Sequence, residues 1–143
     1  MYRINSFLRT GLVVLALLGL AACASAPVKR EGLVIQVSDN NPATWIQALN
    51  TAQNIPALYG APIEVEIVAF GNGLNMLKYD SEVGNRLKTV ATKGIAIKAC
   101  GATMKMMKLT ERDLYPDAGV KVVPSGGVEI IKKQQAGWTN LRP

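Results

Sequence analysis

The apolar residues of this chain switch repeatedly between two spacings, which predicts alternating strands and helices. Runs that are apolar at every position or every second position are typical of strands. They cover residues 32–38, 63–70, 94–99 and 119–123, with a weaker run at 138–142. The segments between them carry apolar residues three or four positions apart, the spacing of a helix. The predicted helices are residues 42–54, 82–93, 101–108 and 126–136.

Capping residues support these helix boundaries. Side chains that favour helix N-termini precede three of the helices, namely Asn41, Ser81 and Ser125. Pro56 is expected to end the first helix, because proline lacks the N–H that a helix interior needs. The last helix carries Val128 and Ile131 three positions apart, which predicts that both lie on its apolar side.

Strands that alternate with helices predict an α/β fold. We expect residues 32–143 to form a three-layer domain, in which a mainly parallel sheet of about five strands has helices on both faces. In such sheets the functional groups collect beyond the carboxyl ends of the strands. These ends are rich in small and polar residues, at positions 38–41, 70–73, 99–103 and 124–127.

Composition narrows the functions that are possible. The 143 residues carry a net charge of +6, but the lysines are scattered and only 6% of residues are aromatic, so we expect no nucleic-acid partner. The chain has no histidine, which excludes catalytic triads, Cys-His pairs and histidine-ligated metals. Met104 and Met107 lie at helical spacing, which favours a core position over a metal-ligand role. We expect neither a metal nor a cofactor.

Residues 1–22 have the pattern of a secretory signal peptide. Arg3 and Arg9 precede an apolar run that is too short to span a bilayer comfortably. The run ends in LAAC, residues 20–23, which resembles a bacterial lipoprotein box. That resemblance implies lipidation of Cys23, with residues 23–31 as a short tether. The alternative is ordinary cleavage within or just after residues 22–26.

The lipoprotein interpretation predicts where the protein resides. A lipid on Cys23 is then the only membrane attachment, and the domain faces the periplasm of a bacterial cell envelope. The residue after the cysteine, Ala24, carries no charge, which favours the outer membrane over the inner one.

Three of the loops offer backbone N–H groups that an anion can bind. Asn72 and Gly73 belong to the sequence FGNG, Gly101 to ACGAT, and Ser125 and Gly126 to PSGG. None of these loops matches the dinucleotide-binding fingerprint or a P-loop. The alternative is that these residues only form turns.

Cys100 lies where a predicted strand ends and a helix begins. The amino end of a helix lowers a thiol pKa, and Lys98 and Lys105 would add positive charge. Such a thiolate suits nucleophilic or sulfur-carrying chemistry. The alternative is a packing residue, because free cysteine is among the most buried residue types. If Cys23 is lipidated, Cys100 is the remaining free thiol of an oxidising compartment, which is unusual.

The residues around this thiol resemble a known family. GIAIKAC followed by GATM, and VKVVPSGGVEIIKKQQAGW near the C-terminus, are similar to the DsrE/DsrF-like family of small sulfur-relay-type α/β proteins. The resemblance covers residues 33–143. It implies that Cys100 accepts sulfur and carries it as a persulfide, and that the protein forms homotrimers or hexamers. The studied relays are cytoplasmic, so their donors and acceptors do not carry over to an exported chain.

Two functional hypotheses remain. In the first, a lipid-anchored envelope protein uses Cys100 as a sulfur carrier or thiol-redox residue, with a second copy of itself and unidentified sulfur donor and acceptor proteins as partners. Whether it is an enzyme stays open, with sulfurtransferase-type chemistry as the candidate. In the second, the protein is a non-enzymatic module that binds a small ligand or a protein, and Cys100 is structural.

Overall fold

The computed structural model describes residues 31–143. The predicted signal peptide, Cys23 and nearly all of the tether lie outside these described residues. Within the described part, no helix combines the length and the apolar character that crossing a bilayer requires.

Five parallel strands form one sheet, as the sequence predicts. They are β1 (Gly32–Val37), β2 (Glu64–Ala69), β3 (Ala96–Cys100), β4 (Lys121–Val123) and β5 (Thr139–Leu141). Their order across the sheet is β4-β3-β2-β1-β5, and every neighbouring pair is parallel. The weak strand prediction near the C-terminus is therefore confirmed, and β5 pairs with β1.

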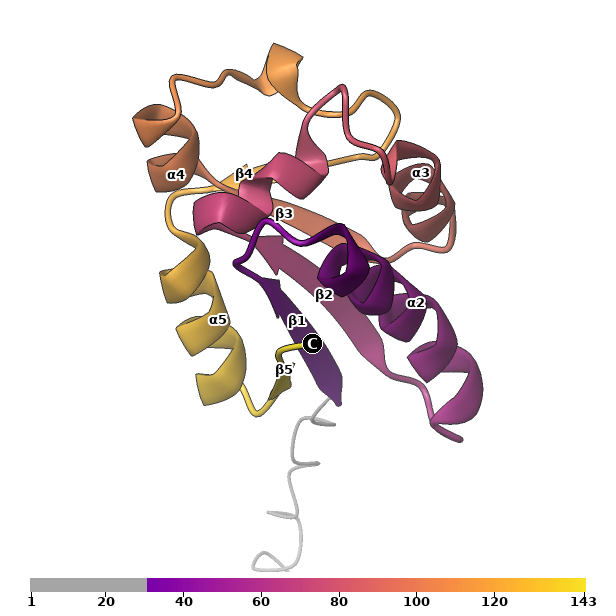
Figure 1. Cartoon of the computed structure of the whole chain (residues 1–143). Coiled ribbons are helices and arrows are strands. Elements are labelled where there is room, and N and C mark those ends of the chain that lie inside the picture. The colour runs from indigo at the N-terminus through magenta and orange to yellow at the C-terminus, as the bar shows by residue number, and fades with distance from the viewer. Residues whose placement is uncertain (1–30) are drawn as a thin grey trace, which may run out of the picture.

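Helices cover both faces of the sheet, which confirms the three-layer prediction (Figure 1). Those of the described chain are α2 (Pro42–Leu58), α3 (Gly84–Thr92), α4 (Gly101–Met106) and α5 (Gly126–Gln135), with the short 3-10 helices η2 (Gly71–Leu77) and η3 (Glu111–Asp113). In Figure 1, α2 and α3 lie on one face and α5 lies on the other. The loops that follow β2, β3 and β4 meet at one end of the sheet.

The larger core lies between the sheet and helices α2 and α3. Ile35, Ile67 and Ile97 are cross-strand neighbours at its centre, and at most 1% of each is exposed. Leu49 of α2 and Leu87 of α3 are fully buried against this layer. The opposite face has a smaller apolar cluster, formed by Val34, Val68 and Ile130 with Phe70 and Trp138 at its margin.

The structure corrects two helix boundaries. Pro56 does not end α2, which continues to Leu58. Proline has a φ angle that a helix accepts and lacks only its own N–H, and the chain beyond it still closes the last turn, where Tyr59 N donates to Ile55 O at 2.9 Å. Ser81 does not cap α3. It precedes a turn in which its hydroxyl accepts from Val83 N at 3.4 Å, and the helix begins at Gly84.

Two strands also begin later than predicted. Gly94 and Gly119 have φ angles of +77° and +57°, in the left-handed region that extended strands do not use. Strands β3 and β4 therefore begin at Ala96 and Lys121 rather than at these glycines.

The apolar side of α5 was wrongly predicted. Val128 and Ile131 are 48% and 54% exposed, and Ile130 is the buried residue. The reason is that the sheet face under α5 is partly polar. Glu66 lies on it, and Lys133 of the helix approaches this carboxylate to 3.1 Å. The helix therefore turns a lysine and one isoleucine inward and leaves the other apolar residues exposed.

Candidate functional site

The candidate site lies at the carboxyl ends of β2, β3 and β4, which are neighbours in the sheet. Cys100 is the last residue of β3 and directly precedes α4. The loop after β4 leads into α5, and the loop after β2 leads into η2. Figure 1 shows α4, η2 and the start of α5 grouped around this end of the sheet. The topology therefore brings three of the four predicted loops together around the thiol.

The thiol is buried beneath the first residue of α5. Only 5% of Cys100 is exposed. A Cβ on Gly126 would lie 3.3 Å from Cys100 Cβ and 3.0 Å from Phe70 Cβ, both tighter than ordinary contacts. A glycine at position 126 thus allows α5 to begin directly against the cysteine. The Ser125 hydroxyl caps this helix by accepting from Val128 N at 3.5 Å, as predicted.

Hydrogen-bond donors around the sulfur set its pKa. Burial raises the pKa of the Cys100 thiol, but the donors outweigh burial and hold the pKa below its ordinary value of 9.0. These donors are the Thr103 hydroxyl and the backbone N–H groups of Gly126, Thr103 and Ala102. The surroundings of Cys100 therefore favour the thiolate, although the residue is almost fully buried.

Thr103 is the residue that sequence reasoning missed. It is 5% exposed, and its hydroxyl accepts from Gly71 N at 3.0 Å while it acts as a donor toward Cys100. It thereby joins the thiol to the loop after β2. A signal was present in the sequence, because a hydroxyl three residues after Cys100 lies within the first turn of α4, next to the preceding strand end.

The other predicted binding residues have different surroundings. Gly126 and Gly101 flank the thiol, but a Cβ on Gly101 would lie 3.1 Å from the Val123 carbonyl oxygen, so this glycine packs against β4. Asn72 is exposed on its loop. Gly73 is buried, and a Cβ there would lie 2.3 Å from the Val37 carbonyl oxygen. Its position is thus explained by packing of η2 against β1.

The expected lysine charges do not act on the thiol. The Lys98 ammonium lies 3.8 Å from Glu66, and Lys105 is exposed. The groups that lower the Cys100 pKa are uncharged donors. Met104 is buried as predicted, whereas Met107 is 36% exposed. Among residues 31–143, no group of three or more acidic or cysteine side chains is placed to hold a metal ion.

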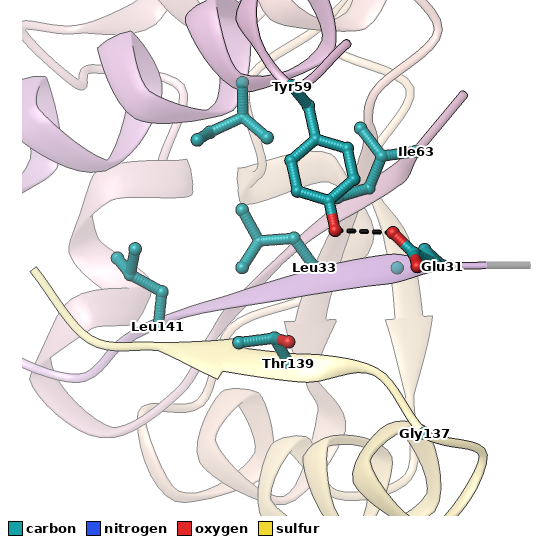
Figure 2. Close-up of a pocket in the computed structure, with 9 residues that line it drawn as sticks. Glu31, Leu33, Tyr59, Ile63, Gly137, Thr139 and Leu141 are labelled. Atoms are coloured by element: carbon teal, nitrogen blue, oxygen red, sulfur yellow. Dashed lines mark hydrogen bonds between the residues drawn. The ribbon is translucent and has the colours of Figure 1, made fainter. Parts of the chain in front are cut away.

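A cavity of about 450 Å³ lies away from Cys100, at the amino ends of β1 and β5. Figure 2 shows its lining, which includes the apolar side chains of Leu33, Ile63 and Leu141. The Tyr59 hydroxyl donates to the Glu31 carboxylate at its edge. This volume is within the range of small-molecule sites, so the fold offers a second candidate for binding.

The thiol should make folding stability depend on pH. Because the Cys100 pKa is lower folded than unfolded, the unfolded chain keeps a proton that the folded chain has released. We expect this contribution to be complete above the unfolded pKa of about 8.5 to 9 and to be lost as pH falls through the folded pKa. Urea unfolding of the protein and of Cys100→Ala at several pH values measures it. The difference between the two should grow with rising pH, and a constant difference would contradict the expectation.

Comparisons with known proteins match the domain that the structure describes. The family model described as the DsrE/DsrF-like family matches residues 32–143. A solved structure of a protein of unknown function, MTH1491 from Methanobacterium thermoautotrophicum, is 26% identical, with a TM-score of 0.74 over 79% of this chain and 99% of that one.

Two further structures share the fold at lower identity. BT1422 from Bacteroides thetaiotaomicron, of unknown function, is 19% identical, with a TM-score of 0.60 over 78% of this chain and 94% of its own. The ychN protein from E. coli is 8% identical, with a TM-score of 0.56 over 78% of this chain and 98% of that one. No curated protein matches the sequence.

Proposed function

Since the chain belongs to the DsrE/DsrF-like family, we propose that it is a thiol protein in which Cys100 accepts a sulfur atom and passes it on. One observation carries this proposal. The thiol is buried, yet the donors around it lower its pKa, which is the opposite of what burial alone does. A cysteine that serves only to fill space needs no such donors.

The proposed transfer conserves the overall redox state. The Cys100 thiolate attacks the outer sulfur of a donor persulfide, forming a new S–S bond while the donor thiolate leaves with the electron pair of the old one. An acceptor thiolate then attacks the terminal sulfur on Cys100, and the Cys100 thiolate is the leaving group. The donors at Thr103 and Gly126 favour both steps in turn, because they stabilise the thiolate as attacking and as leaving group.

Burial limits how a donor reaches the sulfur. With 5% of Cys100 exposed, a protein-bound persulfide needs the first turn of α5 to move away from the thiol. Inorganic polysulfide is a smaller donor, and it also carries a terminal sulfur that a thiolate can attack. In this proposal, the segment 124–127 opens when a partner docks and closes over the loaded persulfide.

Mass spectrometry after exposure to inorganic polysulfide tests the proposal. We expect Cys100 to gain the mass of one sulfur atom and to lose it again on addition of a small thiol. Cys100→Ser is the control and should gain nothing at this position. If Cys100 stays unmodified in the folded protein and is modified only after denaturation, the sulfur-carrier proposal is wrong and Cys100 is a packing residue.

The rival function is binding without sulfur chemistry. It is favoured by the cavity at the amino ends of β1 and β5, whose apolar lining is independent of the thiol (Figure 2). If Cys100 proves unreactive, this cavity becomes the leading candidate site.

The proposal also includes an anchor and self-association. Lipidation of Cys23 would hold the domain at the periplasmic side of an envelope membrane, preferably the outer one. Self-association is supported by the exposed apolar side chains of Val122, Val128 and Ile131, which are 38% to 54% exposed.

A further inference from the structure

Basic residues are concentrated around the helix that covers the thiol. Residues 101–108 and 121–135, which include α4, β4 and α5, carry five lysines and one glutamate. The remaining described residues carry seven basic and nine acidic side chains. Lys133 is paired with Glu66. The other four lysines of this group are exposed, namely Lys105, Lys108, Lys121 and Lys132. One part of the described chain is thus basic, while the rest is slightly acidic.

The elements that carry these lysines lie together. Ala102 N donates to Pro124 O at 3.1 Å, which ties the start of α4 to the loop before α5. A Cβ on Gly101 would lie 3.2 Å from the Val122 side chain, so α4 also begins against β4. Figure 1 shows α4 and α5 on the same side of the molecule, next to the strand end that carries Cys100. The exposed lysines therefore belong to one region of the surface, beside the thiol.

Exposed apolar side chains lie among these lysines. Val128 and Ile131 of α5 are 48% and 54% exposed, and Met106 of α4 is 75% exposed. Val128 and Ile131 are three positions apart and share one side of α5, opposite the side on which Gly126 and Ile130 are buried. Apolar side chains with charged neighbours are typical of protein interfaces. We call these three apolar residues and the four exposed lysines the docking surface.

We propose that the docking surface binds the protein that exchanges sulfur with Cys100, and that acidic side chains surround an apolar centre on this partner. The inference rests on the proposed sulfur transfer, because it names the class of partner for that same site. Opposite charge steers the partner toward the lysines, and the apolar side chains then lose their contact with water. The partner contacts the helix whose first residue, Gly126, covers the thiol, so docking can move that residue away.

The charge and position of this surface favour an acidic protein over other occupants. Two copies of this chain that met through it would bring like charges together. Residues 101–108 and 121–135 contain no aromatic side chain, whereas surfaces that bind single-stranded nucleic acid place aromatic residues among the lysines. Glu31, where the described chain begins, lies at the amino end of β1 (Figure 1). The proposed anchor therefore enters at the end of the sheet away from Cys100.

Two cysteine persulfide peptides that differ only in charge test the proposal. In both, leucines flank the persulfide, and the glutamates of one peptide are replaced by lysines in the other. The Cys100 thiolate takes the outer sulfur, and the peptide thiolate leaves with the electron pair of the old S–S bond. Mass spectrometry of Cys100 measures the rate. At low ionic strength the acidic peptide should load Cys100 at least about tenfold faster, and added salt should reduce this advantage. Equal rates overturn the proposal.

Two pairs of substitutions locate the effect on the docking surface. Lys132→Glu should slow loading by the acidic peptide at least about fivefold. Its control, Lys88→Glu, makes the same charge change on α3 and should alter the rate less than about twofold. Ile131→Ser should also slow loading at least about fivefold, and its control is Leu58→Ser at the end of α2. All four side chains are exposed, so the variants should fold. Equal effects within either pair contradict a specific surface.

A peptide without sulfur separates the docking surface from the sulfur chemistry. The acidic peptide with serine at the persulfide position should still shift the methyl resonances of Val128 and Ile131 in NMR spectra. If polysulfide and both persulfide peptides fail to load Cys100 while these shifts appear, the sulfur-transfer proposal is wrong and the surface remains a docking site for an acidic protein. If the serine peptide causes no shift up to about 10 mM, the docking proposal is wrong.

Three further probes represent the other occupants. Phosphatidylglycerol vesicles and duplex DNA are added in place of the peptide, and sedimentation measures self-association of Ile131→Ser. If vesicles or DNA shift the Val128 and Ile131 resonances and the serine peptide does not, the surface binds lipid or nucleic acid and the docking proposal is wrong. It is also wrong if Ile131→Ser abolishes self-association but leaves loading by the acidic peptide unchanged.

Discussion

Replacing Gly73 by alanine should lower the free energy of unfolding by about 3 kcal/mol, since strongly overpacked sites lie at the upper end of the usual range. The added Cβ would lie 2.3 Å from the Val37 carbonyl oxygen and 2.5 Å from its carbonyl carbon. Both are backbone atoms of β1, so the contact is relieved only if η2 moves away from the sheet. Urea unfolding followed by circular dichroism measures the loss.

Gly71→Ala is the matched control in the same loop. Gly71 has a φ angle of +53°, but its added Cβ would approach nothing closer than the Ser38 carbonyl oxygen at 3.5 Å. We expect a cost of about 1 kcal/mol from backbone strain alone. If the two alanine variants lose the same stability, close packing of η2 on β1 does not explain Gly73. The candidate anion-binding role of that loop would then regain support.

Thr103→Val should slow alkylation of Cys100 at neutral pH by about tenfold or more, because a hydrogen bond to a charged group contributes about 1.5–3 kcal/mol. The valine keeps the shape of the side chain but removes the hydroxyl that lowers the thiol pKa. The pKa should rise, so less thiolate is present below it. The rate of reaction with iodoacetamide as a function of pH measures both the pKa and the thiolate fraction.

Thr103→Ser separates the hydroxyl from the packing of the threonine methyl group. Serine keeps the donor to Cys100 and the acceptor for Gly71 N, so its alkylation profile should stay close to that of the unsubstituted protein. A serine variant as slow as the valine variant would show that packing, rather than the hydroxyl, controls the thiol. Thr103 would then lose its proposed role in sulfur transfer.

The sequence predicted the order of strands and helices because each element has a local signal. Apolar periodicity located all five strands, and Asn41 and Ser125 correctly located two helix starts. The errors arose where a distant contact decides the outcome. The outward direction of Val128 and Ile131 depends on Glu66, which lies about sixty residues earlier in the chain. A helix pattern alone cannot report the polarity of the sheet face beneath it.

The candidate site was predictable only in part for the same reason. The position of Cys100 between a strand and a helix is visible locally, and the structure places it there. Two other relations became visible only after strand pairing. These are the placement of Gly126 over the thiol and the contact of Thr103 with Gly71. The lysines nearest in sequence do not act on the thiol. Lys98 lies on the same face of β3 as Cys100, but its ammonium lies 3.8 Å from Glu66, and Lys105 is exposed.

The pairing of β5 with β1 has a consequence for how the chain folds. Strands β1 to β4 are neighbours in the order in which they are synthesised, so that part of the sheet can grow by adding each new strand to the previous one. The free edge of β1 is covered only when residues 139–141 arrive, about a hundred residues later. Until then β1, whose residues are almost all buried in the finished protein, is an open strand edge on which a second chain can assemble. Residues 139–141 therefore protect the edge of β1 from aggregation, but only late in folding. Removing them should reduce the yield of folded protein more than its final stability.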